Sequence, residues 1–153
     1  MRLSNRSVIV KGLAFGPAAF VLAFGAATAA SAASDVYRSV TTAEAGVVKA
    51  ITASDGKALG RTTASLGKLI EDALKRHQGG QGATACDVAA HSLAFVAASA
   101  AEALANSGEA KRLLLDDAKA AAADFAKDMQ ACDKQSGQKM GSHTSVEKAL
   151  RAL

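Results

Sequence analysis

Two cysteines, Cys86 and Cys132, are the residues with the clearest chemistry in this sequence. Their spacing excludes a C-x-x-C redox motif and a C-x-x-C-H haem-attachment motif, because neither pattern occurs. In an exported protein an even number of cysteines favours a disulfide, whereas a pair of buried free thiols is the alternative. We therefore predict a disulfide between Cys86 and Cys132, conditional on export.

Three histidines could in principle ligate a metal or a haem inside a helical protein. His77, His91 and His143 are the only ones in the chain, and no two of them have the i, i+4 spacing of a helical metal site. If the two predicted helices form a hairpin that turns at the glycine-rich segment 79–82, His77 and His91 should be displaced from each other along the helix axes by about 10 Å, at 1.5 Å of rise per residue. His143 falls in a polar segment that we expect to be a loop. The pattern predicts three unrelated histidines.

Three carboxylates, Asp117, Asp124 and Asp128, should share one flank of a predicted helix. Such a row could bind a cation, but it is more typical of a solvated flank or of ion pairs with a neighbouring helix. The sequence contains no G-x-S-x-G motif and no phosphate-binding glycine loop followed by Lys and Ser or Thr. We therefore predict no catalytic, cofactor or metal site, and no enzymatic activity.

The first 32 residues have the pattern of a cleavable secretory signal peptide. A basic start with Arg2, Arg6 and Lys11 precedes a short apolar stretch, which is followed by a small-residue tract with two A-x-A sites. Cleavage is expected after Ala32, and an uncleaved anchor is the alternative. The predicted organisation is a signal peptide over 1–32 and one helical domain over 33–153, periplasmic or secreted, without a stable membrane span after cleavage.

Removal of the leader changes the interpretation of the charge. The leader holds three of the 18 Lys and Arg residues and none of the 14 Asp and Glu residues, so 15 basic residues remain against 14 acidic ones. The basic pI is thus mainly a property of the leader. Aromatic side chains for stacking on bases are also scarce after it, which argues against nucleic-acid binding.

Alanine is abundant, and apolar residues recur at three- and four-residue steps. Both features predict an all-α fold. We expect four helices, over about 35–53, 57–77, 85–105 and 108–132, in an antiparallel up-down bundle. A short C-terminal helix should cover 145–153. Ser54-Asp55-Gly56 is interpreted as a helix stop followed by a new N-cap. The alternative is one long helix over 35–77 with two shorter helices packed on it, in which Gly46, Ala53, Gly60 and Gly67 would form a close-packing groove.

The segment 85–105 is unusual because it is apolar on two faces. One face is ordinary core, but the opposite face carries Val88, His91, Phe95 and Ala98, where an outer bundle helix should be polar. Such a surface should be covered. We expect the cover to be the C-terminal helix, with its stripe of Val146, Ala149, Leu150 and Leu153; a second molecule, either a homodimer partner or another envelope protein, is the alternative.

These observations together favour an exported, non-enzymatic structural or protein-interaction module of a bacterial cell envelope. The alternative function is a periplasmic helical bundle that binds a small ligand, a metal or haem.

Overall fold

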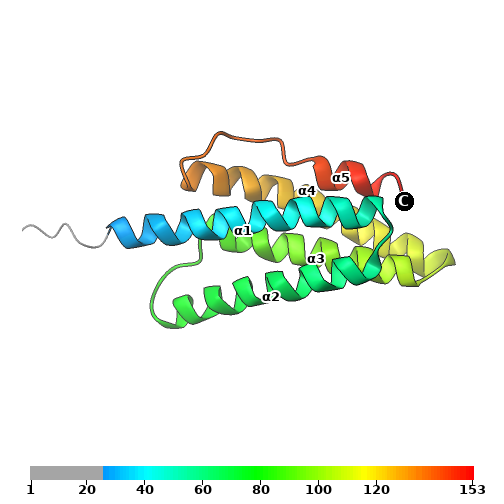
Figure 1. The fold of residues 1–153 in the computed structure, drawn as a ribbon, viewed down its shortest axis with the longest axis horizontal. Coiled ribbons are helices and arrows are strands. Elements are labelled where there is room, and N and C mark those ends of the chain that lie inside the picture. Colours follow the sequence, from blue (N-terminus) through cyan, green and yellow to red (C-terminus); the bar gives the residue numbers. More distant parts are fainter. Residues whose placement is uncertain (1–25) are drawn as a thin grey trace, which may run out of the picture.

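The computed structural model describes the chain from Ala26 to Leu153, with side chains from Ser34 onwards. The described residues form five helices: α1 (Ala26–Thr52), α2 (Gly56–Gln78), α3 (Ala85–Ala105), α4 (Gly108–Gln135) and α5 (Ser145–Leu150). Helices α1 to α4 run up and down along a common long direction, and the short α5 lies beside them (Figure 1). The predicted all-α bundle of four helices plus a short C-terminal helix is confirmed.

The connection between α1 and α2 decides between the two predicted architectures. The chain turns at Ser54, which has a left-handed backbone with φ of 51°. The Asp55 carboxylate then accepts a hydrogen bond from the Ala58 amide at 2.8 Å and so caps α2. The single long helix over 35–77 is therefore wrong. Its predicted glycine groove does not form either, since a Cβ built on Gly60 or Gly67 would meet nothing within 4 Å.

Helix α1 starts at Ala26, nine residues earlier than the expected start at Asp35. The segment before Asp35 is rich in alanine and contains no glycine or proline after Gly25, so nothing in the sequence ends the helix there. The predicted leader thus lies partly in α1 and partly, over residues 1–25, outside the described residues. Its cleavage after Ala32 stays a prediction.

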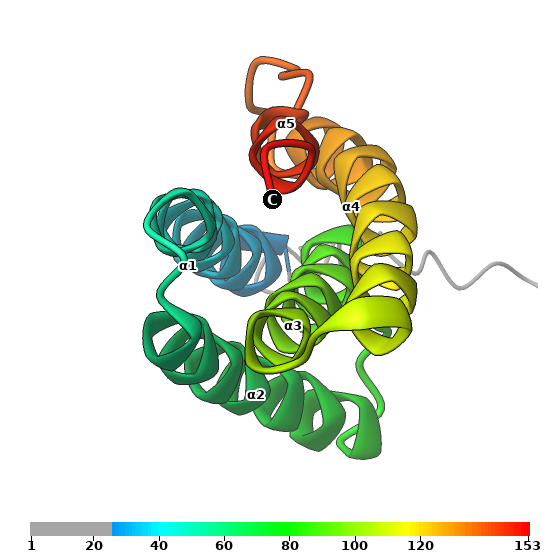
Figure 2. The ribbon, with the colours of Figure 1, turned by 90° about the vertical axis from the view of Figure 1, so that its right-hand side faces the viewer.

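Helix α3 is the centre of the bundle, with α2 and α4 on either side and α1 across it (Figure 2). Its core face consists mainly of small side chains, which allows the neighbouring helices to approach closely. Among the described residues, α3 is also the one helix long and apolar enough to cross a membrane by length and composition. In the bundle its buried residues are Cys86, Asp87, Ala89, Ala90, Leu93, Val96, Ala97, Ser99, Ala100 and Ala103.

A capping box fixes the start of α3. The Thr84 hydroxyl accepts from the Asp87 amide, and the Asp87 carboxylate accepts from the Thr84 amide at 2.9 Å. Asp87 is nearly buried, and Arg76 from the end of α2 pairs with it at 2.6 Å. One carboxylate thereby caps α3 and ties it to α2.

Helix α5 packs in the groove between α1 and α4. Figure 2 shows it at the opposite side of the bundle from α2. Its Val146 and Leu150 are fully buried there. The expected cover of the Phe95 surface by the C-terminal helix is therefore wrong. The apolar stripe was identified correctly, but α1 and α4 leave an apolar groove of their own, and α5 fills that one.

Candidate functional sites

Cys86 and Cys132 form a disulfide that joins α3 to α4. Cys86 lies in the first turn of α3 and Cys132 near the end of α4, so the bond closes the open end of the helical hairpin. The two Cα atoms are 4.6 Å apart, and both side chains are fully buried. The Ala85 amide of α3 also donates a hydrogen bond to the Gln135 side chain of α4 at 2.7 Å, which joins the two helices at the same end of the hairpin.

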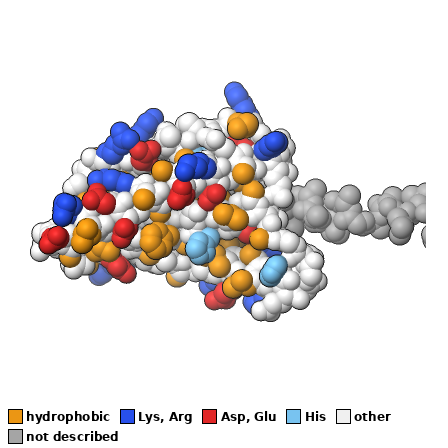
Figure 3. Space-filling model, turned by 180° about the vertical axis from the view of Figure 1, so that it is seen from behind, with side chains coloured by type: hydrophobic (Ala, Val, Ile, Leu, Met, Phe, Trp, Pro, Cys, Tyr) orange, Lys and Arg blue, Asp and Glu red, His pale blue; other side chains and the backbone are white. Residues whose placement is uncertain are grey.

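The outward face of α3 is apolar and exposed. Phe95 is 52% exposed and Val88 is 47% exposed, and Leu74 of α2, at 56%, continues the surface onto the next helix. His91 is exposed between them, and Ala98 is half-buried. Figure 3 shows apolar side chains gathered with the histidines on the side of the molecule that faces away from the viewer in Figure 1. We refer to Leu74, Val88, His91 and Phe95 as the Phe95 face.

Two shallow grooves run along the Phe95 face. The first lies between α2 and α3 and is almost entirely apolar; it is lined by Ile70, Ala73, Leu74, His77, Ala83, Asp87, Val88 and His91. The second lies between α3 and α4; it is lined by His91, Ser92, Phe95, Asp117, Ala120, Ala121 and Asp124. Among the described residues that line these grooves there is no Lys or Arg, so the fixed charges are all carboxylates.

The three predicted helix-flank carboxylates border the second groove or lie next to it. Asp124 pairs with Lys127 at 3.0 Å, and Asp128 accepts a hydrogen bond from the Ser92 hydroxyl of α3 at 2.6 Å. The flank thus forms ion pairs and hydrogen bonds rather than a cation cage. In the part of the chain with described side chains, no group of three or more His, Cys, Asp or Glu residues is placed to hold a metal ion.

The histidines differ from the sequence interpretation in two ways. His77 and His91 were expected to be unrelated, yet both line the groove between α2 and α3. His143, expected to be an isolated loop residue, lies in a nearly buried cluster of charged groups. This cluster is the candidate site that sequence reasoning missed.

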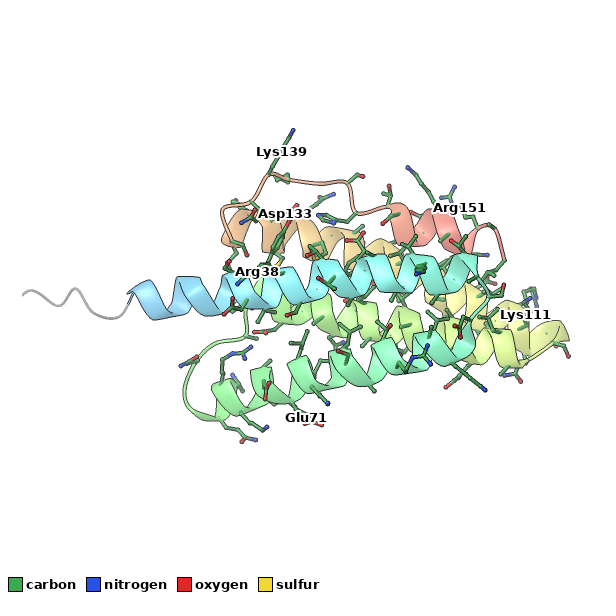
Figure 4. All side chains as sticks on the ribbon, viewed as in Figure 1. Arg38, Glu71, Lys111, Asp133, Lys139 and Arg151 are labelled. Atoms are coloured by element: carbon green, nitrogen blue, oxygen red, sulfur yellow. A yellow bond between two sulfur atoms is a disulfide. The ribbon has the colours of Figure 1, made fainter. Side chains whose placement is uncertain are left out.

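His143 bridges two carboxylates from different helices. Its Nε2 is 2.8 Å from Asp133 Oδ2 of α4, and its Nδ1 is 3.3 Å from Glu44 Oε2 of α1. The Asp133 side chain is fully buried, and Figure 4 shows it on α4 beneath the loop that carries Lys139. We call His143, Asp133 and Glu44 the His143 clasp.

Local backbone geometry presents the imidazole to its partners. His143 itself adopts a left-handed φ of 48°, which is uncommon for a residue with a side chain. Gly141 donates its amide to Asp133 Oδ2 at 2.7 Å. A Cβ on Gly141 would lie 2.9 Å from the imidazole, so any side chain at this position would displace the ring from its present place. The Phe125 ring completes the pocket, edge-on to the imidazole with the centroids 6.4 Å apart.

The imidazole of the clasp is engaged at both of its nitrogens. Both imidazole nitrogens face carboxylates, so neither is directed toward a substrate. The nearby Ser145 hydroxyl donates to Glu44 at 2.6 Å instead of to the histidine. The arrangement therefore lacks the nucleophile–base contact of an acyl-transfer site.

The electrostatics of the clasp favour the imidazolium form. Burial by itself lowers the pKa of His143, but the hydrogen bonds and charges of Asp133 and Glu44 outweigh it and raise that pKa above the ordinary 6.5. Tyr37 of α1 lies near the same carboxylates. Burial, followed by the charge and hydrogen bonding of Asp133, raises the pKa of the Tyr37 phenol above 10.0, so it stays neutral where His143 titrates.

Comparison of the chain with protein-family models, with curated proteins and with solved structures finds no match.

Proposed function

We propose that this chain is an exported, non-enzymatic protein-interaction module of a bacterial cell envelope, which binds an apolar, basic segment of a partner protein at the Phe95 face. The observation that carries the proposal is the exposure of Leu74 and Val88 along one groove and of Phe95 along the next, with His91 lining both grooves. Aromatic side chains are enriched at protein interfaces, and a contiguous exposed apolar patch marks an interaction site.

The charge around the face favours a different protein over a second copy. The grooves carry Asp117, Asp124 and Asp87 but no Lys or Arg among their described residues. Asp87 pairs with Arg76, and Asp124 pairs with Lys127. Asp117 is therefore the carboxylate that carries the charge argument. In a symmetric dimer the same patch meets itself, and Asp117 would then meet a groove whose described lining has no Lys or Arg. A partner helix with an apolar stripe and Lys or Arg at its edges would complement both features.

Export is supported by the leader pattern and by the disulfide, which is compatible with a non-cytoplasmic location. N-terminal sequencing of the protein from the envelope or culture fluid should find a chain that starts at Ala33 or Ser34. A mature protein that still starts at Met1 would contradict the predicted cleavage.

The binding proposal can be tested with two designed helical peptides that share one leucine stripe and differ in carrying Lys or Glu at its edges. We expect the Lys peptide to bind, with NMR shift changes centred on Val88, His91 and Phe95. The Glu peptide should bind at least tenfold more weakly. Phe95→Asp should lower the affinity for the Lys peptide by about 30-fold, which corresponds to the loss of a contact residue worth about 2 kcal/mol.

Met140→Asp is the matched control, because Met140 is also an exposed apolar residue but lies in the loop before α5. It should leave binding unchanged. Equal binding of both peptides, or shift changes away from the face, would refute the proposal. A concentration-dependent dimer that Phe95→Asp abolishes would assign the face to a second copy instead.

A further inference from the structure

The last 17 residues of the chain form a strap over the groove between α1 and α4. The strap consists of the loop from Gly137 and the helix α5, whose Val146 and Leu150 are fully buried against the bundle. Helix α5 has six residues. Helices shorter than about 12 residues are marginal in water by themselves, so α5 depends on its docking for stability.

The His143 clasp ties this strap to both helices beneath it. On the strap side the contacts are the imidazole, the Gly141 amide and the Ser145 hydroxyl; on the bundle side they are the carboxylates of Asp133 and Glu44. Asp133 Oδ1 is buried and has no hydrogen-bond partner among the described residues. The other oxygen, Oδ2, accepts from the Gly141 amide and contacts the His143 imidazole, both on the strap, while the Tyr37 phenol of α1 lies near the same carboxylate.

An imidazole can serve both carboxylates only when both of its nitrogens carry a proton. In neutral histidine one nitrogen becomes an acceptor, and its lone pair then faces a carboxylate oxygen. Asp133 or Glu44 then loses the imidazole donor and keeps the Gly141 amide or the Ser145 hydroxyl, respectively. A buried carboxylate that loses the charge facing it is costly. Closure of the strap and protonation of His143 must therefore be coupled.

We propose that residues 137–153 form a proton-dependent strap, which His143 holds on α1 and α4 while the imidazole is charged and which detaches when the imidazole loses its proton. Detachment uncovers a second apolar surface, the groove that Val146 and Leu150 fill. This surface lies apart from the Phe95 face, so the strap does not depend on the proposed partner.

The direction of the pH dependence follows from linkage. The clasp raises the pKa of His143 above the value in the open state. The stabilisation is therefore fully present below about pH 6.5, and it is lost as the pH rises through the raised pKa. The charged groups that face the imidazole are Asp133 and Glu44, and the Tyr37 phenol lies near the same two carboxylates. The phenol of Tyr37 stays protonated across this window, because its pKa lies above 10.0.

The test measures two quantities on the full-length mature protein. NMR titration gives the pKa of His143, and hydrogen exchange gives protection factors for the α5 amides, each corrected for the intrinsic rate at that pH. If the pKa of His143 exceeds 6.5 by one unit, the protection factors of the α5 amides should fall tenfold between pH 6 and pH 9. Each further unit should add another factor of ten. Amides of α3 and α4 should keep their protection.

Three variants separate the clasp from general effects of pH. His143→Gln should remove the pH step and leave α5 weakly protected throughout, whereas His91→Gln, at an exposed histidine, should leave the step intact. Glu44→Gln should keep the step but move it to lower pH, because a neutral amide stabilises the imidazolium less. Protection of α5 that is independent of pH in the parent, or a step that persists in His143→Gln, would overturn the proposal.

Discussion

Replacing Cys86 and Cys132 together by alanine is expected to lower the free energy of unfolding by about 4 kcal/mol. The disulfide joins residues separated by 46 positions, and the chain-entropy model assigns a loop of that size about 4 kcal/mol at 25 °C. Small domains have a total stability of about 5–15 kcal/mol, so this bond accounts for a large share of it. Chemical denaturation of the parent and of the double variant measures the difference.

The reductant provides the control for this experiment. Adding it should shift the denaturation midpoint of the parent toward that of the double-alanine variant and leave the variant itself unchanged. A further outcome is expected from the location of the bond, since both sulfurs are fully buried. Reduction of the native protein should be slow and should accelerate in denaturant. A parent and variant of equal stability would show that the disulfide contributes nothing to the native state.

Local signals in the sequence predicted the parts of the fold that short-range chemistry determines. The stop at Ser54 and the N-cap at Asp55 require only a few adjacent residues. The disulfide was predicted from the even number of cysteines in a chain expected to be exported, and it forms because Cys86 and Cys132 are buried on adjacent helices at the open end of one hairpin. In each case the partners are near in sequence or lie on consecutive helices.

The parts that sequence reasoning missed depend on long-range placement. Periodicity showed that the C-terminal helix has an apolar stripe, but two apolar grooves were open to it, and the sequence does not rank them. His143 gave no signal because its partner Glu44 is 99 residues away, on a helix whose contact with the loop depends on where α5 docks. The buried position of Asp133, directly after Cys132, was the available clue.

Leu66→Ala is expected to destabilise the protein by about 2–5 kcal/mol, the range for removing a buried leucine side chain from a well-packed core. Leu59 and Leu66 are the buried residues of α2, and Leu66 is fully inaccessible to solvent. The fully buried apolar attachment of this 23-residue helix therefore rests on two side chains, with Ala58 and Leu69 packed partly against the same core. Thermal or chemical denaturation of the variant, monitored by circular dichroism, measures the loss.

Leu74→Ala is the matched control, because it makes the same chemical change on the same helix at a side chain that is 56% exposed. Its stability should stay within about 0.5 kcal/mol of the parent. Its effect should fall on binding instead, since Leu74 belongs to the Phe95 face and should contribute to the affinity for the Lys peptide. The two leucines would then separate the two roles of α2, with Leu66 holding the helix on the bundle and Leu74 contacting the partner. A large stability loss in Leu74→Ala without loss of peptide affinity would show instead that the exposed edge of α2 serves the fold and not the partner.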